Sequence, residues 1–310
     1  MIIVRFTSGL GNQMFQYNLY RRMQETYPDT QVKADLTWFY ANDDHHGYEL
    51  EKCFSHDLSA FSIEEASYGE ILKLTGQLPN MSKKHGRAFE RFRRYPNRIL
   101  RIFTAEKRKP FILNRMIQEI PYEEIMHLDT SKDWYLIGFW VEECYYRDRT
   151  DKLQKELVFD QNYGEKNAAL LQEMQEETSV SIHVRRGDYL TAYAGQFRDL
   201  GEDYYKKAVG RIMEACDSPR FYIFSDDSDF IRHAFNWLEN KVIVDHNTGS
   251  DSFRDLQLMS SCRHNIIANS TFSAWAAILN RHPDHLTIYP SAYLAGEDSE
   301  TKTLPGWIRI

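Results

Sequence analysis

Apolar and polar positions follow a regular order along the second half of the chain. Short apolar runs predict strands, because a strand buried on both faces is apolar without interruption. They lie at residues 179–185, 220–225, 241–245, 265–269 and 285–289. Between these runs, apolar residues recur every three or four positions, which predicts helices. Strands that alternate with helices are typical of a doubly wound parallel sheet, so the pattern predicts an α/β fold.

The first half of the chain shows this order only at its start. We expect an apolar strand at residues 1–6, a helix from Asn12 and a second strand at 31–36. The region from about residue 40 to 132 shows no such alternation, and an irregular, helical insertion is expected there. A polar stretch at 160–164 marks the expected end of this first part of the chain.

Length and composition support two globular domains. The chain has 310 residues, of which 42% are hydrophobic, and this is enough for two domains of about 150 residues each. We place them at 1–160 and 161–310. The four cysteines show no close spacing, which argues against a zinc site or a disulfide framework and favours a reducing cytoplasm. No apolar run approaches the ~20 residues of a membrane span, so neither a signal peptide nor a transmembrane anchor is expected.

A basic block interrupts the acidic chain at residues 83–109. It holds eleven lysines and arginines against Glu90 and Glu106, with aromatic residues between the charges, in a chain of net charge −7. One interpretation is an amphipathic helical hairpin with a solvated basic face. The other is a patch that contacts an anionic membrane surface. Nucleic acid is not expected as a partner, because the whole chain is acidic, with a pI near 5.9.

The motif with the clearest chemistry is His-Val-Arg-Arg-Gly-Asp-Tyr at residues 183–189. Arg185 and Arg186 follow a predicted strand, and open α/β sheets bind ligands beyond the carboxyl ends of their strands. A guanidinium stays charged and matches a pair of phosphate oxygens. With the titratable His183 and the carboxylate of Asp188 beside them, the arginines suit a reaction in which a phosphorylated group leaves. The alternative is a surface ion pair at the end of a strand.

Two further segments join a predicted strand to a helix. In the segment Gly9-Leu-Gly-Asn-Gln-Met-Phe-Gln-Tyr17, the glycines let a backbone approach a ligand, although the third glycine of a dinucleotide fingerprint is missing. In the segment Asn269-Ser-Thr-Phe-Ser273, small hydroxyls begin a helix, where unpaired N–H groups attract anions. A plain β–α turn and an ordinary helix cap are the alternatives for these two segments.

Together with Phe224-Ser-Asp-Asp227 and Tyr135-Leu-Ile-Gly-Phe-Trp140, these motifs resemble the family 11 glycosyltransferases, the α-1,2-fucosyltransferases. Phe139 replaces a usual tyrosine of the family, and Ala274 stands where a tryptophan is common. The resemblance implies a GT-B-like fold in which two Rossmann-type domains face a central cleft. It also implies a bacterial enzyme that transfers L-fucose, with inversion, from GDP-β-L-fucose to the 2-hydroxyl of a terminal galactose.

The resemblance also implies a set of site residues. The C-terminal domain would bind GDP-fucose, and an acidic segment at Asp255 resembles one that contacts the base in related fucosyltransferases. Catalysis would rest on Asp188 as proton acceptor, with Arg185 and His183. The donor-binding candidates are Gly11, Asn12, Gln13, Arg185, Arg186, Ser225, Asp226, Asp255, Asn269, Ser270, Thr271 and Phe272. The acceptor-binding candidates are His46, Tyr48, Phe139 and Trp140.

The expected partners are GDP-fucose as co-substrate and a galactose-terminated oligosaccharide or glycolipid. No cofactor and no metal are expected, because two arginines can stabilise a leaving diphosphate. One alternative is a metal-dependent nucleotide-sugar transferase that uses Asp227 and Asp229. Another is a non-catalytic carbohydrate-binding relative. The expected location is the cytoplasm, with the inner face of the cytoplasmic membrane as an alternative if the basic block binds lipid.

Overall fold

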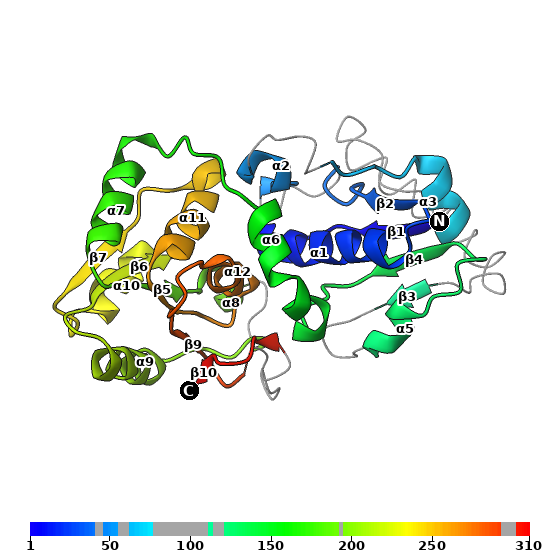
Figure 1. Cartoon of the computed structure of the whole chain (residues 1–310). Coiled ribbons are helices and arrows are strands. Elements are labelled where there is room, and N and C mark those ends of the chain that lie inside the picture. Colours follow the sequence, from blue (N-terminus) through cyan, green and yellow to red (C-terminus); the bar gives the residue numbers. More distant parts are fainter. Residues whose placement is uncertain (41–45, 55–61, 77–110, 114–120, 192–194, 293–301) are drawn as a thin grey trace. The chain divides into compact units, whose positions relative to one another are not determined.

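The computed structural model describes residues 1–40, 46–54, 62–76, 111–113, 121–191, 195–292 and 302–310. The chain forms two compact units (Figure 1). The first holds the described residues up to Tyr145, and the second holds Cys53, Phe54 and the described residues from Tyr146 onward. This division falls before the polar stretch at 160–164. The basic block at 83–109 lies outside the described residues.

The first unit contains a parallel four-stranded sheet of order β2-β1-β4-β3. Strands β1 (Ile2–Arg5) and β2 (Val32–Asp35) confirm the two strands that the sequence predicts. Strands β3 (Phe111–Leu113) and β4 (Trp134–Ile137) were not predicted. The order places β1 beside β4, so the segments that follow these two strands lie at the same edge of the sheet.

Helix α1 (Leu10–Thr26) follows β1 and packs on β1 and β2 (Figure 1). It is buried along most of its length, and its buried residues include glutamines and an asparagine. Buried amides need hydrogen-bond partners, and these side chains find them in neighbouring loops. Asn18 Nδ2, for example, donates to the carbonyl of Tyr145 at 2.7 Å. The helix therefore holds loops in place as well as filling the core.

Shorter helices complete the first unit: α2 (Leu50–Cys53), α3 (Tyr68–Thr75) and α5 (Tyr122–Met126). Helix α3 begins with a capping box. Ser67 Oγ accepts from the Glu70 N–H, and the Glu70 carboxylate accepts from the Ser67 N–H. It ends at Gly76, whose φ of 60° suits glycine because other residues pay a steric cost there.

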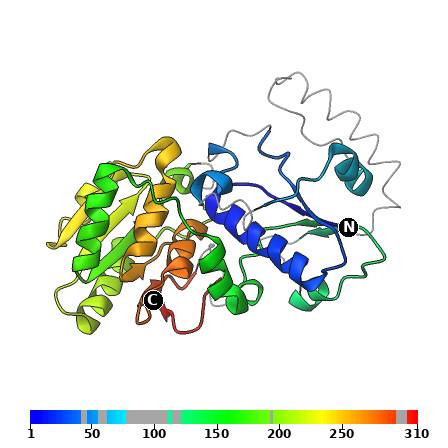
Figure 2. The same ribbon diagram turned by 45° about the horizontal axis from the view of Figure 1, so that its top comes forward.

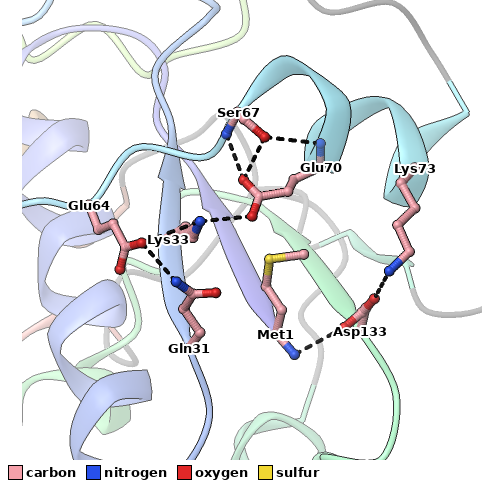
Figure 3. A network of polar contacts seen from close by, with 8 residues as sticks. All are labelled: Met1, Gln31, Lys33, Glu64, Ser67, Glu70, Lys73 and Asp133. Carbon is pink, nitrogen blue, oxygen red and sulfur yellow. Dashed lines mark hydrogen bonds and ion pairs between the residues drawn. The ribbon is translucent and has the colours of Figure 1, made fainter.

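A polar network ties α3 to the sheet (Figure 3). Lys33 on β2 donates to Glu70 at 2.7 Å and pairs with Glu64 at 3.2 Å. At the other end of the helix, Lys73 pairs with Asp133 at 3.0 Å, and Asp133 also accepts from the amino group of Met1 at 3.1 Å. These pairs explain how a short helix stays docked on the sheet.

The second unit contains a parallel six-stranded sheet of order β10-β9-β8-β5-β6-β7. All five predicted strands are present. They are β5 (Ser179–Val184), β6 (Arg220–Ser225), β7 (Lys241–Val244), β8 (His264–Ile266) and β9 (Thr287–Tyr289). The predicted strand at 265–269 ends early, at Ile266. The sixth strand, β10 (Ile308–Arg309), was not predicted.

Helices cover both faces of this sheet, as the alternation of side chains along β5 shows. Val180, Ile182 and Val184 join the apolar core that contains α9 (Glu202–Ala215) and α10 (Ser228–Ala234). Ser181 and His183 face the opposite side, because successive side chains of a strand point to opposite faces. That side is covered by α7 (Gly164–Glu176), α11 (Phe253–Ser261) and α12 (Thr271–Leu279), of which α11 packs on the other two (Figure 2).

The strand order has one topological switch point. When the strands of this unit are numbered along the chain, their order in the sheet is 6-5-4-1-2-3. Strands 1 to 3 are added toward one edge of the sheet and strands 4 to 6 toward the other, so the switch point lies between β5 and β8. Open α/β sheets bind ligands at the carboxyl ends of the strands beside such a point. The segments that leave β5 and β8 there are residues 185–187 and 267–271. Two of the three motif segments therefore meet at one place in the fold.

Among the residues that the structure describes, no helix combines the length and apolar character needed to cross a bilayer.

Candidate active site

A single carboxylate holds both arginines at the end of β5. Asp226 follows β6, the neighbour of β5, and its Oδ2 lies 3.1 Å from Arg185 Nη1. Its Oδ1 accepts from the backbone N–H of Arg186 at 2.9 Å. The arginine side chains are about one quarter exposed, at 24% and 22%. Asp226 was predicted to bind the donor, and its contacts show that it positions the arginines.

Arg186 makes two further contacts. Its Nε lies 3.3 Å from Asp227 Oδ2, and its guanidinium carbon lies 3.5 Å from the centre of the Phe230 ring. Asp227 also caps α10, because its Oδ1 accepts from the Phe230 N–H at 3.0 Å. The backbone N–H of Asp227 in turn donates to Ser225 Oγ at 3.0 Å. A metal bound by Asp227 and Asp229 would therefore compete with a helix cap and an ion pair. The described residues include no group of three or more histidines, cysteines and carboxylates arranged to hold a metal.

Gly187 lies against the carboxylate that holds the arginines. A Cβ at this position would lie 2.6 Å from Asp226 Oδ2, which is closer than real Cβ atoms approach another atom. Any larger residue here would therefore have to displace the Asp226 carboxylate. Asp188 follows within the short helix α8 (Gly187–Leu190). The structure does not describe its side chain, so its role as proton acceptor stays a prediction.

His183 is buried at the end of β5, with its ring 5.8 Å from that of Phe272 on α12. Its Nδ1 is buried without a hydrogen-bond partner. Burial, helped by the charge of Arg185, lowers the pKa of His183 to about 3. The imidazole is therefore uncharged near neutral pH. Such a group is a weak proton acceptor, and this favours a positioning role over a role as base.

The start of α12 is held from both sides of the switch point. Asn269 Nδ2 donates to the carbonyl of Arg198 at 2.7 Å, and the Asn269 carbonyl accepts from Tyr189 Oη at 2.9 Å. Ser270 caps the helix by accepting from the Phe272 N–H at 3.3 Å. Ser270 therefore forms the helix cap that the sequence offered as the alternative, and its contact with the donor stays a prediction. Because Tyr189 belongs to the arginine motif, its bond to Asn269 links the two motif segments.

The predicted base-contacting residue lies in the first turn of α11. Asp255 Oδ1 accepts from Asn247 Nδ2 at 2.8 Å. The side chain is partly exposed, and burial raises its pKa to about 7, although the bond from Asn247 acts in the opposite direction. A carboxyl with such a pKa needs donors to become ionised near neutral pH. Asn247 supplies one such donor, and the contact of Asp255 with a base stays a prediction.

In the first unit, two buried glutamines of α1 shape the predicted site. Gln16 accepts from the Thr7 N–H at 2.9 Å and donates to the Gly138 carbonyl at 3.0 Å, so it ties the segment after β1 to that after β4. Gln13 donates to the carbonyls of Ser8 and Gly47 and accepts from the Glu49 N–H at 2.9 Å. Gln13 thus supports the loop, and its contact with the donor stays a prediction. Of the residues beside it, Gly11 is buried and Asn12 is partly exposed.

Backbone strain gathers in the same loops. Ser8, His46 and Trp140 have φ angles of 67°, 65° and 59°, a region that side chains other than glycine rarely occupy and that is common at functional sites. His46 is exposed and Phe139 is partly exposed. Tyr48 is half-buried, and its hydroxyl is enclosed without a partner.

One predicted acceptor residue needs correction. The Trp140 side chain is 0% exposed and packs edge-on against Tyr145, with ring centres 5.5 Å apart. A sugar cannot stack on a ring that is enclosed on all sides. Tertiary packing places Trp140 in the core, where its backbone has one of the strained φ angles.

Three residues that hold the candidate donor and acceptor segments were not among the predicted site residues. They are Gln16, Glu49 and Asn247. Gln16 left a signal, since a glutamine that stands among Met14, Phe15 and Tyr17 predicts a buried amide with a partner. Glu49 and Asn247 left none. Glu49 is buried with Oε1 unpartnered, and burial raises its pKa to about 7.

Known proteins match this chain along much of its length. It is 28% identical to the α-1,2-colitosyltransferase of Escherichia coli over 100% of the chain and 99% of that protein. It is 37% identical to the E. coli O-antigen biosynthesis glycosyltransferase WbnK, over 43% of the chain and 44% of that protein. Against the galactoside 2-α-L-fucosyltransferase Sec1 of Mus musculus it is 28% identical over 60% of each.

The fold is similar to that of a solved glycosyltransferase. The fucosyltransferase NodZ from Bradyrhizobium superposes with a TM-score of 0.52 at 12% identity, over 90% of this chain and 91% of that one. The likeness confirms the predicted GT-B type of α/β fold. The sequence profile of glycosyl transferase family 11 matches residues 112–310, which include the arginine motif, Asp255 and the start of α12. The chain therefore belongs to glycosyl transferase family 11 and is a glycosyltransferase.

Proposed function

We propose that this glycosyltransferase moves L-fucose from GDP-β-L-fucose to the 2-hydroxyl of a terminal galactose, forming an α-1,2 linkage with inversion. The observation that carries the proposal is the pair Arg185 and Arg186, held by one carboxylate at the topological switch point. Support for the linkage comes from relatives whose names describe α-1,2 transfer of colitose or transfer of fucose to a galactoside.

The donor half of the proposal follows from charge. As the bond between the fucose C1 and the β-phosphate oxygen breaks, the electron pair leaves with GDP. Two guanidiniums stabilise that developing charge, and the N-terminus of α12 adds the favourable end of its dipole near Thr271. We propose that these groups suffice without a metal and that no cofactor is needed. Asp255 would accept from the N1–H and the exocyclic amine of guanine.

The acceptor half rests on residues in the first unit. The exposed ring of His46 and the partly exposed rings of Tyr48 and Phe139 are available to a sugar, and a galactose-terminated oligosaccharide or glycolipid is the proposed acceptor. The acceptor oxygen forms its bond to C1 while its proton passes to a base, for which Asp188 stays our proposal. We also propose a cytoplasmic location, with the basic block at 83–109 as a contact for anionic membrane.

The reaction is tested directly by the product. The protein is incubated with GDP-fucose and a panel of acceptors with terminal β-galactose, terminal glucose or terminal N-acetylglucosamine. We expect fucose on the galactose acceptors alone, with an α-1,2 linkage seen by NMR. Transfer to another hydroxyl, or a retained β configuration, contradicts the proposal. Sugar binding without turnover of the donor favours the non-catalytic alternative.

A second donor belongs in the same panel. The relative that matches the whole chain is named a colitosyltransferase. A higher kcat/KM with nucleotide-activated colitose than with GDP-fucose would mean that colitose is the sugar transferred. The proposed type of reaction would stay the same.

A further inference from the structure

We propose that Asn247 and Asn167 form an amide clamp that positions the Asp255 carboxylate and thereby sets the preference for a guanine nucleotide. The inference rests on the proposed function, in which Asp255 contacts the base. It adds residues outside the base-contacting segment: one on α7 and two in the loop after β7.

The two amides bind each other reciprocally. Asn167 Nδ2 donates to Asn247 Oδ1 at 2.9 Å, and Asn247 Nδ2 donates back to Asn167 Oδ1 at 3.1 Å. The second hydrogen of Asn247 Nδ2 goes to Asp255 Oδ1, and that of Asn167 Nδ2 goes to the Tyr163 carbonyl at 3.1 Å. Two parallel bonds hold both amide planes in one orientation. All four amide hydrogens are in use.

His246 sets the direction of this chain of bonds. Its Nε2 lies 2.7 Å from Asn167 Oδ1, an atom that can only accept, so Nε2 carries the proton. Burial and the charge of Lys166 lower the pKa of His246, which favours the neutral ring. The order of donation then runs from His246 to Asn167, from Asn167 to Asn247 and from Asn247 to the carboxylate. The clamp therefore always presents a donor to Asp255.

The clamp matters because no charged side chain of the described residues pairs with Asp255. Arg254, its neighbour on α11, donates to Gln257 at 2.8 Å and to the Asp160 carbonyl at 3.1 Å, and Lys166 on α7 acts on His246. Among the described residues, Asp255 forms no ion pair and takes its hydrogen bond from Asn247. Burial raises its pKa to about 7. Ionisation therefore depends on neutral donors, which are Asn247 and the bound base.

This arrangement selects guanine. Guanine presents two donors on one edge, hypoxanthine presents one, and adenine presents an acceptor at N1. A carboxylate whose Oδ1 is already directed by Asn247 meets the two-donor edge in a fixed orientation. Without the clamp the carboxyl turns and protonates more readily, so it no longer distinguishes one donor from two.

The test is nucleotide binding by calorimetry, with GDP, IDP and ADP between pH 6 and pH 8.5. For the wild type we expect GDP to bind about tenfold more tightly than IDP, the value of one hydrogen bond to a charged group. Asn247→Ala should weaken GDP binding about tenfold and bring the ratio of GDP affinity to IDP affinity (the GDP/IDP ratio) close to one. The rise of GDP affinity with pH should move to higher pH. Asn240→Ala is the control, since Asn240 caps the Pro219 carbonyl elsewhere in the unit at 2.9 Å and should keep the ratio.

A second pair of variants probes the direction of the clamp without touching Asp255. His246→Gln keeps an N–H donor and should preserve the GDP/IDP ratio, while His246→Leu removes the donor and should lower it. Thermal midpoints show that each variant is folded.

The outcomes separate the clamp from the function on which it rests. If Asn247→Ala keeps the wild-type ratio while Asp255→Asn abolishes it, the clamp is wrong and base recognition by Asp255 stands. If Asp255→Asn also keeps the ratio, the role of Asp255 in the proposed function is wrong as well. A wild type that binds no GDP contradicts both.

Discussion

A Cβ added at Gly187 would lie 2.6 Å from Oδ2 of Asp226. The same carboxylate accepts from the Arg186 N–H and pairs with Arg185. The main chain of the motif is thus packed directly on the group that orients its arginines. A larger residue here would have to move that carboxylate, and this contact is the reason for glycine, because Gly187 is not among the described residues with a positive φ.

Gly187→Ala should therefore damage the donor site more than the fold. The methyl group displaces the Asp226 carboxylate, and both arginines lose their common partner. We expect GDP affinity and kcat/KM to fall about tenfold or more, as for loss of a charged hydrogen bond. Gly210→Ala is the matched control: nothing lies within 4 Å of its added Cβ. That change should leave activity intact and stabilise α9 by about 0.5–1 kcal/mol.

Arg185→Lys tests whether a planar guanidinium is needed. A lysine offers a point charge and cannot bind two phosphate oxygens side by side. We expect kcat/KM to fall at least about tenfold, which corresponds to ~1.4 kcal/mol. Arg211→Lys, at an exposed pair with Glu214, is the control. Rates close to wild type in Arg185→Lys would remove Arg185 from the proposed donor site.

Turnover should survive exhaustive chelation. Asp227, the first ligand of the alternative metal site, already caps α10 and pairs with Arg186. We expect the rate of fucose transfer after treatment with a chelator to stay within about twofold of the untreated rate, since arginines replace the metal. Activity that disappears and returns with manganese or magnesium alone supports the metal-dependent alternative.

Because of Glu49, we expect the free energy of unfolding to fall as pH rises. Burial raises its pKa from 4.5 to about 7. A raised pKa in the folded state gives a stabilising contribution that is complete below the unfolded pKa and is lost as pH rises toward 7 and beyond. The difference between these two pKa values corresponds to a contribution to the free energy of unfolding on the order of 3 kcal/mol.

Glu49→Gln removes this titration. Urea unfolding at pH 5 and pH 8 should show a smaller loss of stability with pH in the variant than in the wild type. Glu51→Gln, at an exposed neighbour, should behave like the wild type. An identical pH dependence in wild type and Glu49→Gln shows that Glu49 does not titrate in this range.

Glu70 should act in the opposite direction, at acid pH. Its hydrogen bond from Lys33, followed by those from Ser67, lowers its pKa to about 2. A lowered pKa gives stability that is present above the unfolded value near 4.5 and is lost as pH falls toward 2. The difference in thermal midpoint between wild type and Glu70→Gln should therefore shrink between pH 5 and pH 2. A difference that is constant with pH would mean that the Lys33–Glu70 pair in Figure 3 contributes no charge-dependent stability.

The predicted strands of the second unit were recovered because each overlaps a short, mostly apolar run that lies between two helical segments. The strands that were missed are short, and Phe111–Leu113 and Trp134–Ile137 are apolar runs next to a region without regular alternation. Trp134–Ile137 has four residues and Ile308–Arg309 has two, the last of them an exposed arginine. Their pairing depends on the neighbouring strand more than on their own composition. The cap at Ser270 was predictable, because an N-cap acts within one helical turn.

The sequence by itself determined the alternation of strands and helices from β5 to β9, the arginine motif after β5 and the hydroxyls at the start of α12, since each is encoded by neighbours along the chain. Tertiary structure decided which groups meet these residues. Asp226 reaches Arg186 across 40 positions of sequence, and Asn167 reaches Asn247 across 80. It also decided that Trp140 is enclosed and that Asp255 titrates near 7. Partners of this kind follow from strand order and from the exclusion of water, which depend on the whole folded chain and on no local pattern.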